Sequence, residues 1–391
     1  MVSGRHFLQI PGPTNVPEQV LQAMARPTID HRGPGFADLY GRVHTRLQQV
    51  FDTVSPVLVY PSSGTGAWEA TLVNTLDPGD RVLMYETGHF ATLWADMART
   101  LGLEVEWLPG DWRHAVDPVA IEEALSRDSA HRIKAVAVTH TETSTGVTAA
   151  VPDIRAAIDR TDHPALLFVD AVSSLASTAY HHDAWGVDVT VSASQKGLML
   201  PPGLSFTAIS DRALSVSRAG ATRRSYWSWE AILNSNATGY FPYTPATNLL
   251  FGLIAAIDLL LEEGLDQVFA RHQRLAEATR LAVEAWGLQI FASAPQQRSN
   301  AVTAVEVPEG YDADALRQLI LHRFDVSLGT GLGRVKGRIF RIGHLGYLNE
   351  PMLLGTLASI EGGLVASGVP IERAGLRAAL DHLVTTGSSA R

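Results

Sequence analysis

Short apolar, β-branched runs alternate with longer stretches of helical spacing over the first two thirds of the chain. A short run bounded by turn residues predicts a buried strand, and apolar residues three and four apart predict an amphipathic helix. Strands are predicted at Val57–Tyr60, Arg81–Tyr85, Glu104–Leu108, Ala135–Thr139, Leu166–Val169 and Val187–Ser192. Helices are predicted at Gly66–Thr75, Phe90–Leu101, Pro118–Ser126, Val151–Arg160 and Ala246–Glu263. This alternation predicts an α/β fold in which helices wrap a mainly parallel sheet.

The pattern changes in the C-terminal third. A long helical stretch, Val268–Trp286, is followed by strand-like Ala301–Val307, helical Ala313–Arg323 and strand-like Arg338–Ile342. This mixture predicts a smaller α+β domain. Because 391 residues exceed what one simple core needs, three parts are expected. They are an N-terminal arm at residues 1–15, a large domain at 16–263 and a small C-terminal domain at 264–391.

The composition excludes several classes of function. The formal net charge is −9 with no basic run, so neither nucleic acid nor a membrane surface is expected as a partner. No apolar run approaches the length that spans a bilayer and no signal peptide is evident, so a cytoplasmic location is expected. The chain has no cysteine, which excludes disulfides, thiolate metal sites and cysteine nucleophiles. His181-His182-Asp183 lacks a distant partner at metal spacing, so no metal site is predicted.

A candidate catalytic pair follows two of the predicted strands. The apolar run Ala165–Val172 contains Asp170 near its end, and a later run passes into Ser194-Gln195-Lys196-Gly197. Pyridoxal phosphate chemistry needs a lysine for the Schiff base and a carboxylate that keeps the pyridine nitrogen protonated. A surface lysine and a helix-capping aspartate are the plain alternatives, but the apolar run before Lys196 argues against exposure. The pattern therefore indicates a pyridoxal phosphate enzyme.

A second motif could bind the phosphate of such a cofactor. The predicted strand that ends at Tyr60 leads into Ser63-Gly64-Thr65 at the start of a helix. Free backbone N–H groups, hydroxyls and a glycine at a helix N-terminus form an anion cradle. The segment fits neither the Walker loop nor the dinucleotide fingerprint. An ordinary capped helix start would look the same in isolation, but together with Asp170 and Lys196 the segment indicates a phosphate site.

A third polar segment, Thr139–Gly146, also follows a predicted strand. Open α/β sheets bind ligands at the carboxyl ends of their strands. Hydroxyl donors in this segment could reach the phenolic oxygen of the cofactor, although a polar turn without function would have a similar sequence.

Taken together, these segments resemble the class V aminotransferases of pyridoxal phosphate fold type I, and within them the serine–glyoxylate and alanine–glyoxylate aminotransferases. The resemblance is carried by Ser63–Gly66, Glu142–Gly146, Asp170–Ser174, Ser194–Gly197 and Arg341–Gly346. Pro11–Pro17, Gly239–Pro245 and Leu328–Gly333 extend it over nearly the whole chain, and Gly329–Gly333 is interpreted as a loop near the active site. It implies a large domain with a helix-wrapped, mainly parallel sheet, and a smaller α+β domain.

The resemblance also implies roles for individual residues. Lys196 would form the Schiff base and then move a proton between the substrate Cα and the cofactor, and Asp170 would pair with the pyridine nitrogen. The other cofactor contacts it implies are Ser63, Gly64, Thr65 and Gln195 at the phosphate, Phe90 against the ring, Thr143 at the phenolic oxygen, and Val172. Phe90 stands where relatives often have Trp, and it still offers an apolar π-face.

Arg341 is expected to bind the α-carboxylate of the substrate, since a guanidinium group meets a carboxylate with two parallel hydrogen bonds. Its apolar neighbours Ile339 and Phe340 argue against a surface position. In relatives the region around Tyr240 comes from the second subunit. The resemblance therefore implies a homodimer with shared active sites, in which Tyr240 and Thr244 complete the phosphate site of the other copy.

The reaction that the resemblance implies is a ping-pong transamination through Lys196, with glyoxylate as amino acceptor and serine as the expected donor. Alanine or aspartate could replace serine as donor. A β-cleaving lyase of the kynureninase type is an alternative on the same fold, whereas a cysteine desulfurase is excluded because no cysteine is present. A non-catalytic binding protein would be expected to lack the lysine or the aspartate, and both are present.

Overall fold

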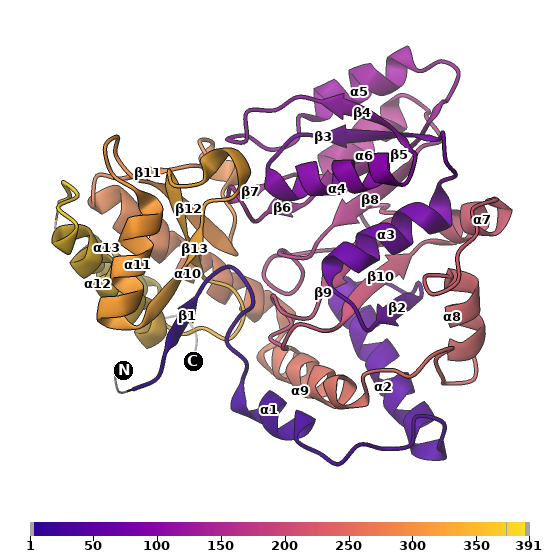
Figure 1. The fold of residues 1–391 in the computed structure, drawn as a ribbon, viewed down its shortest axis with the longest axis horizontal. Helices are drawn as coiled ribbons and strands as arrows, with labels where there is room; N and C mark the ends of the chain where they lie inside the picture. Colours follow the sequence, from indigo (N-terminus) through magenta and orange to yellow (C-terminus); the bar gives the residue numbers. More distant parts are fainter. Residues whose placement is uncertain (1–3, 373, 388–391) are drawn as a thin grey trace.

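Residues 4–372 and 374–387 are described by the computed structural model, which contains two main β-sheets side by side (Figure 1). The larger sheet has seven strands in the order β2-β10-β9-β8-β5-β3-β4. Their bounds are β2 Val57–Tyr60, β3 Arg81–Tyr85, β4 Glu104–Leu108, β5 Ile133–Thr139, β8 Leu166–Asp170, β9 Val189–Ala193 and β10 Ser205–Ile209. A separate small hairpin pairs β6, Thr141–Glu142, with β7, Val147–Thr148.

The larger sheet is mainly parallel, as the sequence predicts. Strands β4, β3, β5, β8 and β9 run parallel to one another, whereas β10 pairs antiparallel with both β9 and β2. Strand β10 is absent from the sequence prediction. It begins just after the turn that follows Lys196, so the chain returns beside β9 in the opposite direction, as a short connection requires.

Helices cover both faces of this sheet, which explains why its central strands β5, β8, β9 and β10 are almost entirely buried. Side chains of α3, α4, α7 and α8 pack on one face, and those of α2, α5, α6 and α9 on the other. The bounds are α1 Glu18–Met24, α2 Pro34–Phe51, α3 Gly64–Thr75, α4 His89–Thr100, α5 Pro118–Arg127, α6 Val151–Arg160, α7 Asp211–Ala219, α8 Trp229–Asn236 and α9 Thr247–Glu263. None of the helices in the described part of the chain has the length and apolar character needed to span a bilayer.

The second sheet has five strands in the order β1-β13-β14-β12-β11. They are β1 Phe7–Gln9, β11 Gln289–Ile290, β12 Val302–Glu306, β13 Val326–Thr330 and β14 Ile339–Gly343. Helices α10 Leu265–Ala285, α11 Ala313–Phe324, α12 Glu350–Ala366 and α13 Gly375–Thr386 accompany it, with short 3-10 turns at η1 Pro295–Gln297 and η2 Gly333–Val335. The α+β character predicted for the C-terminal third is confirmed, whereas the exact division at residues 15 and 263 stays a prediction.

Two features of this sheet differ from the prediction. The N-terminal segment contributes β1, which pairs in parallel with β13 and so becomes part of the sheet formed by the C-terminal third (Figure 1). The segment Gly329–Gly333, interpreted as a loop, begins inside β13. Its glycines hide the strand because they lack the β-branched side chains that mark strands in a sequence.

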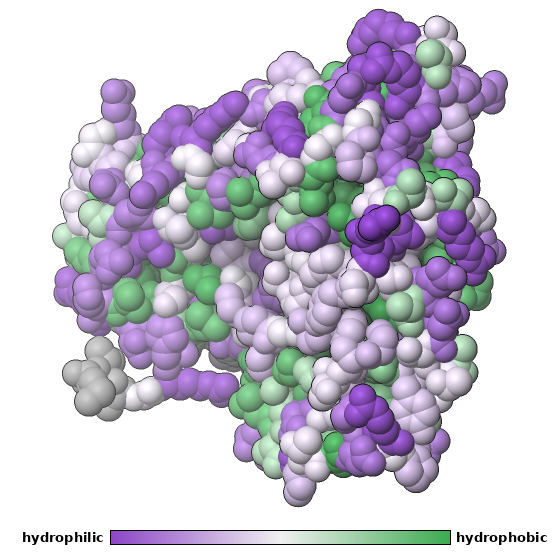
Figure 2. All heavy atoms as spheres, turned by 45° about the vertical axis from the view of Figure 1, so that its right-hand side comes forward, coloured by the Kyte–Doolittle hydropathy of each residue, from purple (hydrophilic) through white to green (hydrophobic). Residues whose placement is uncertain are grey.

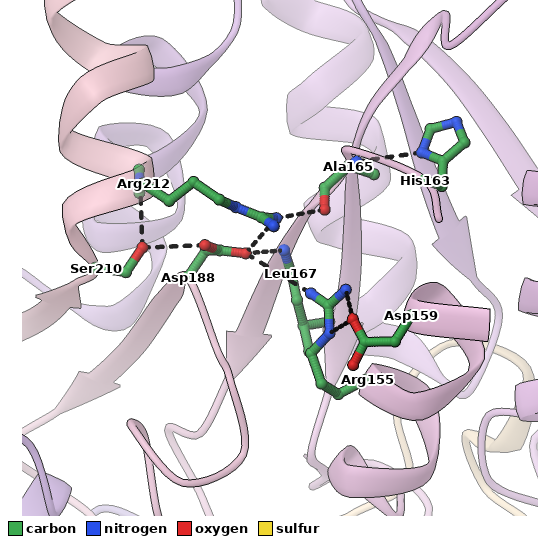
Figure 3. A network of polar contacts seen from close by, with 9 residues as sticks. Arg155, Asp159, His163, Ala165, Leu167, Asp188, Ser210 and Arg212 are labelled. Atoms are coloured by element: carbon green, nitrogen blue, oxygen red, sulfur yellow. Dashed lines mark hydrogen bonds and ion pairs between the residues drawn. The ribbon is translucent and has the colours of Figure 1, made fainter. Parts of the chain in front are cut away.

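A buried carboxylate fastens the start of the central strands. Asp188 precedes β9 and accepts hydrogen bonds from the Leu167 backbone N–H at 2.8 Å, from Arg212 Nη2 at 2.8 Å and from Ser210 Oγ at 3.0 Å (Figure 3). Arg155 Nη1 lies 4.0 Å from the same carboxylate. Asp188 therefore connects strands β8 and β9 with helices α6 and α7.

Replacing this carboxylate is expected to destabilise the protein. Asp188→Ala leaves the Leu167 N–H without an acceptor and removes charge-assisted bonds, a loss of about 2–3 kcal/mol in the free energy of unfolding. The measurement is urea unfolding followed by circular dichroism. Asp159→Ala is the matched control, because its exposed side chain makes a surface pair with Arg155 (Figure 3). Equal midpoints for the two variants would contradict the prediction.

Candidate active site

The carboxyl ends of β5, β8 and β9 open onto a cavity of about 260 Å³. Parallel strands bring the residues that follow them to one edge of the sheet, where ligands bind in open α/β folds. The lining residues come from these ends, from the first turns of α3 and α4, and from the N-terminal segment. They are Gly12, Pro13, Ser63, Gly64, Thr65, Trp68, Phe90, Thr141, Thr143, Asp170, Val172, Gln195, Lys196 and Pro202.

One end of the cavity is built by the N-terminus of α3. Ser63 is the N-cap in extended conformation, and its side chain makes no capping hydrogen bond. A Cβ atom on Gly64 would lie 2.8 Å from a methyl group of Val172, so only glycine fits there. The side-chain oxygen of Gln195 is buried without a hydrogen-bond partner among the described residues. Free hydroxyls and helix N–H groups together suit an anionic group such as a phosphate, to which Gln195 can contribute only the N–H donors of its amide.

Asp170 ends β8 and is almost completely buried. Its Oδ1 accepts a hydrogen bond from the Val172 N–H at 2.7 Å, and its Oδ2 accepts one from Trp68 Nε1 at 3.2 Å. Burial raises the pKa of Asp170 to about 7, and the negative charge of Glu142 acts in the same direction. A cationic ring nitrogen beside this carboxylate would offset the cost of burying it.

Lys196 follows β9 and is also buried. Its Nζ donates a hydrogen bond to the carbonyl of Pro11. A Cβ atom on Gly12, whose φ is +101°, would lie 2.7 Å from Nζ, so the N-terminal segment passes directly over the lysine and needs glycine there. Burial lowers the pKa of Lys196 to about 7, helped by the positive charge of Arg341. A large share of the amine is therefore neutral, and thus nucleophilic, near neutral pH.

The turn after β5 connects the cavity with its surroundings. Glu142 is fully buried and accepts hydrogen bonds from the N–H groups of Phe90 at 3.4 Å and Ala91 at 3.0 Å, so it caps α4. This cap places Phe90 at the cavity wall. Thr143 shares a hydrogen bond with Ser173, and both side chains are buried.

Arg341 lies in β14 beside this turn. It is buried, and donates hydrogen bonds to the carbonyls of Thr143 at 2.8 Å and Thr330 at 2.7 Å. Burial lowers its pKa to about 10, which still leaves it charged at neutral pH. Within residues 4–372 and 374–387 it forms no ion pair. A buried guanidinium held by two neutral carbonyls and lacking a carboxylate partner is suited to a carboxylate ligand.

The structure brings nine of the twelve predicted site residues to one cavity, and leaves Tyr240, Thr244 and Arg341 outside its lining. Tyr240 instead stacks on Phe36 of α2. Five lining residues were absent from the predicted site: Gly12, Pro13, Trp68, Thr141 and Pro202. Trp68 follows Gly64 by one helical turn, and this i, i+4 spacing is the signal that could have pointed to it.

Comparison with known proteins agrees with this geometry. The sequence profile of the aminotransferase class V family matches residues 6–335. The chain belongs to the class V aminotransferase family. It is 46% identical over 97% of its length to a serine–glyoxylate aminotransferase of Methylorubrum extorquens, of which 96% is covered. It is 42% identical to an L-aspartate–glyoxylate aminotransferase of Paracoccus denitrificans, covering 98% of this chain and 97% of the relative.

Solved structures show the same likeness. The ureidoglycine–glyoxylate aminotransferase of Bacillus subtilis superposes with a TM-score of 0.91 at 28% identity, covering 98% of this chain and 99% of the other. The pyridoxamine–pyruvate aminotransferase of Mesorhizobium loti gives a TM-score of 0.91 at 29% identity, covering 97% of each chain. The predicted fold type I is thereby confirmed. The cofactor of this class V aminotransferase is pyridoxal 5′-phosphate, and the anion cradle at the start of α3 and the buried Asp170 carboxylate fit it.

The lowered pKa of Lys196 predicts unusual amine reactivity. Only the neutral amine reacts with acetic anhydride, so the acetylation rate of Lys196 is expected to reach half of its plateau near pH 7 and to change little above pH 8, in contrast to an amine with the ordinary value of 10.5. Mass spectrometry of the Lys196 peptide from cofactor-free protein measures it. Exposed Lys134 in the same samples controls for reagent decay. A rate that still rises steeply above pH 9 would contradict the prediction.

Proposed function

We propose that this aminotransferase transfers the amino group of serine to glyoxylate, giving hydroxypyruvate and glycine. The observation that carries the proposal is the 46% identity over nearly the full length to serine–glyoxylate aminotransferases of Methylorubrum extorquens and, over 93% of the chain, of Hyphomicrobium methylovorum. Aspartate is the second candidate donor, supported by the 42% identity to the aspartate–glyoxylate enzyme. The cavity residues are compatible with both donors, since they recognise what amino acids share.

When bound, pyridoxal phosphate supplies an electron sink for the pair of electrons left at the substrate Cα. The protein must then do three things: hold the cofactor at both ends, hold the substrate carboxylate, and move one proton. We assign the phosphate to Ser63, Gly64, Thr65 and Gln195, the ring nitrogen to Asp170, the ring face to Phe90 with Val172 on the other side, and the phenolic oxygen to Thr143.

Lys196 is assigned the proton transfer. Its neutral amine would hold the cofactor covalently, and once a substrate had released it the same amine would be free to accept the Cα proton and give it back. Burial supports this role, because it lowers the pKa of Lys196 to about 7, which suits both taking up and giving back a proton at neutral pH.

Arg341 is assigned the substrate α-carboxylate. Its two backbone hydrogen bonds fix the guanidinium plane, and the bond to Thr143 places it next to the cavity wall. Because glyoxylate, serine and aspartate all carry a carboxylate beside the reacting carbon, one buried arginine can serve both halves of the reaction.

A homodimer is part of the proposal, as is a cytoplasmic location. Tyr240 and Thr244 lie outside the lining of the cavity in their own chain. If they contact a cofactor phosphate, as the family resemblance implies, they do so in a second copy. Nearby Tyr226 supports such an interface, because it stacks on Tyr243 with 45% of its surface exposed.

The experiment that tests the function is a set of half-reactions with the purified, cofactor-loaded enzyme. Serine, aspartate and alanine are added separately, and the oxo acid formed in one turnover is quantified. Glyoxylate is then added, and glycine is quantified. Serine is expected to give hydroxypyruvate, and glyoxylate to give one equivalent of glycine. Release of ammonia and pyruvate from serine would instead show a β-eliminating lyase, and turnover of aspartate alone would select the second candidate.

Arg341 variants test the carboxylate assignment. Arg341→Lys keeps the charge but loses the two parallel bonds, and is expected to raise KM for both serine and glyoxylate by about tenfold or more, since a hydrogen bond to a charged group contributes about 1.5–3 kcal/mol. Arg317→Lys serves as the control, because this nearby arginine already pairs with Asp314. Steady-state kinetics at saturating cofactor measures the change. A KM shift for only one of the two substrates would contradict a shared carboxylate site.

A further inference from the structure

We propose that Trp68 is a positioning residue that holds the Asp170 carboxylate in its ionised form toward the cofactor ring. The proposal rests on the role assigned to Asp170 under the proposed function. Trp68 is 4% exposed, lines the cavity and donates its indole N–H to Asp170 Oδ2 at 3.2 Å. An indole nitrogen donates a hydrogen bond and accepts none, so it favours the carboxylate over the carboxylic acid.

The electrostatic surroundings of Asp170 explain why this hydrogen bond matters for its ionisation. Lys196 favours the ionised carboxylate, whereas burial and the charge of Glu142 oppose it. Tyr180 is the other titratable group that interacts electrostatically with Asp170 among the described residues. The amine of Lys196 loses its charge near neutral pH. Its stabilisation of the ionised Asp170 carboxylate therefore changes with pH and whenever the amine reacts. The indole N–H and the Val172 N–H do not titrate, and they remain donors throughout.

The backbone of α3 adds a second, geometric role. Gly64 opens this helix at the anion cradle, and Trp68 lies four residues later on the same side. One rigid helical turn therefore sets the separation between the phosphate end of the site and the carboxylate at the nitrogen end. Trp94 of α4 stacks on Trp68 with ring centroids 5.7 Å apart and planes 16° apart, which fixes the indole in place.

This stacked pair offers a matched control. Both indoles are buried, and both lose a similar volume when replaced by phenylalanine. The difference is that the Nε1 of Trp94 has no hydrogen-bond partner among the described residues, whereas that of Trp68 bonds Asp170. Trp94→Phe therefore reports the cost of loosening the stack alone, and Trp68→Phe reports that cost plus the lost donor.

The test is the Kd of the full-length chain for pyridoxal 5′-phosphate, measured across pH for the unmodified protein, Trp68→Phe, Trp94→Phe, Asp170→Asn and the double variant Trp68→Phe/Asp170→Asn. Losing the donor raises the pKa of Asp170, so affinity on acidification is expected to fall at a higher pH in Trp68→Phe. At pH 7 its Kd should be about tenfold or more weaker than that of Trp94→Phe, the size of a charge-assisted hydrogen bond. In the Asp170→Asn background, Trp68→Phe should add no more than Trp94→Phe does alone.

The possible outcomes distinguish the role of Trp68 from the role of Asp170. If Asp170→Asn leaves the Kd unchanged, the proposed pairing of Asp170 with the ring nitrogen is wrong, and the role proposed for Trp68 fails with it. If Asp170→Asn weakens binding but Trp68→Phe matches Trp94→Phe in Kd and pH profile, the assignment survives and the role of Trp68 is overturned. Circular dichroism and thermal unfolding of every variant establish that folded proteins are compared, and an effect of Trp68→Phe that persists in the Asp170→Asn background also overturns the proposal.

Discussion

The site depends on one constraint: four ionisable side chains are buried away from water at one edge of the large sheet. Asp170 and Glu142 are buried beside Lys196 and Arg341, two acids against two bases. Burying an unpaired charge is costly, and the mutual attraction of opposite charges offsets that cost. The shifted pKa values of Lys196 and Asp170 are the direct result, since burial moves both toward the neutral form. Reactivity at neutral pH thus follows from where the sheet places these groups, at an edge closed off from water.

The same constraint explains how the backbone around the site is arranged. Each buried group needs hydrogen-bond partners, and here many of them are backbone groups: the Pro11 carbonyl for Lys196, the Val172 N–H for Asp170, and the Thr143 and Thr330 carbonyls for Arg341. Backbone can approach this closely only where side chains are small. Gly12 and Gly64 have no room for a Cβ atom, at the lysine and at the cradle respectively.

Much of the fold could be predicted from the sequence because its signals are local. The strands Val57–Tyr60 and Arg81–Tyr85 have the predicted bounds, since each is a short, mainly apolar run bounded by turn residues. Strand β10 was not predicted because pairing back onto the preceding strand leaves no local pattern in the sequence. Strand β13 was not predicted because it contains a glycine and lacks a continuous β-branched pattern. In the site, Asp170 and Lys196 stand out as polar ends of apolar runs. Trp68 does not, because a tryptophan in an apolar helix looks like core, and its partner Asp170 is 102 residues away.

The N-terminal segment and the small sheet have a shared function in this arrangement. Strand β1 is anchored by β13 in the small sheet, and the chain then crosses to Lys196 and the cavity of the large sheet. Arg341 reaches the same place from β14, next to β13, through the carbonyl of Thr143. The small sheet therefore positions both the N-terminal segment that lies over Lys196 and the guanidinium that we assign to the substrate carboxylate. A shift of the small sheet would move the N-terminal segment and Arg341 together. Binding of the substrate carboxylate and access to the Lys196 amine are therefore expected to change together rather than independently.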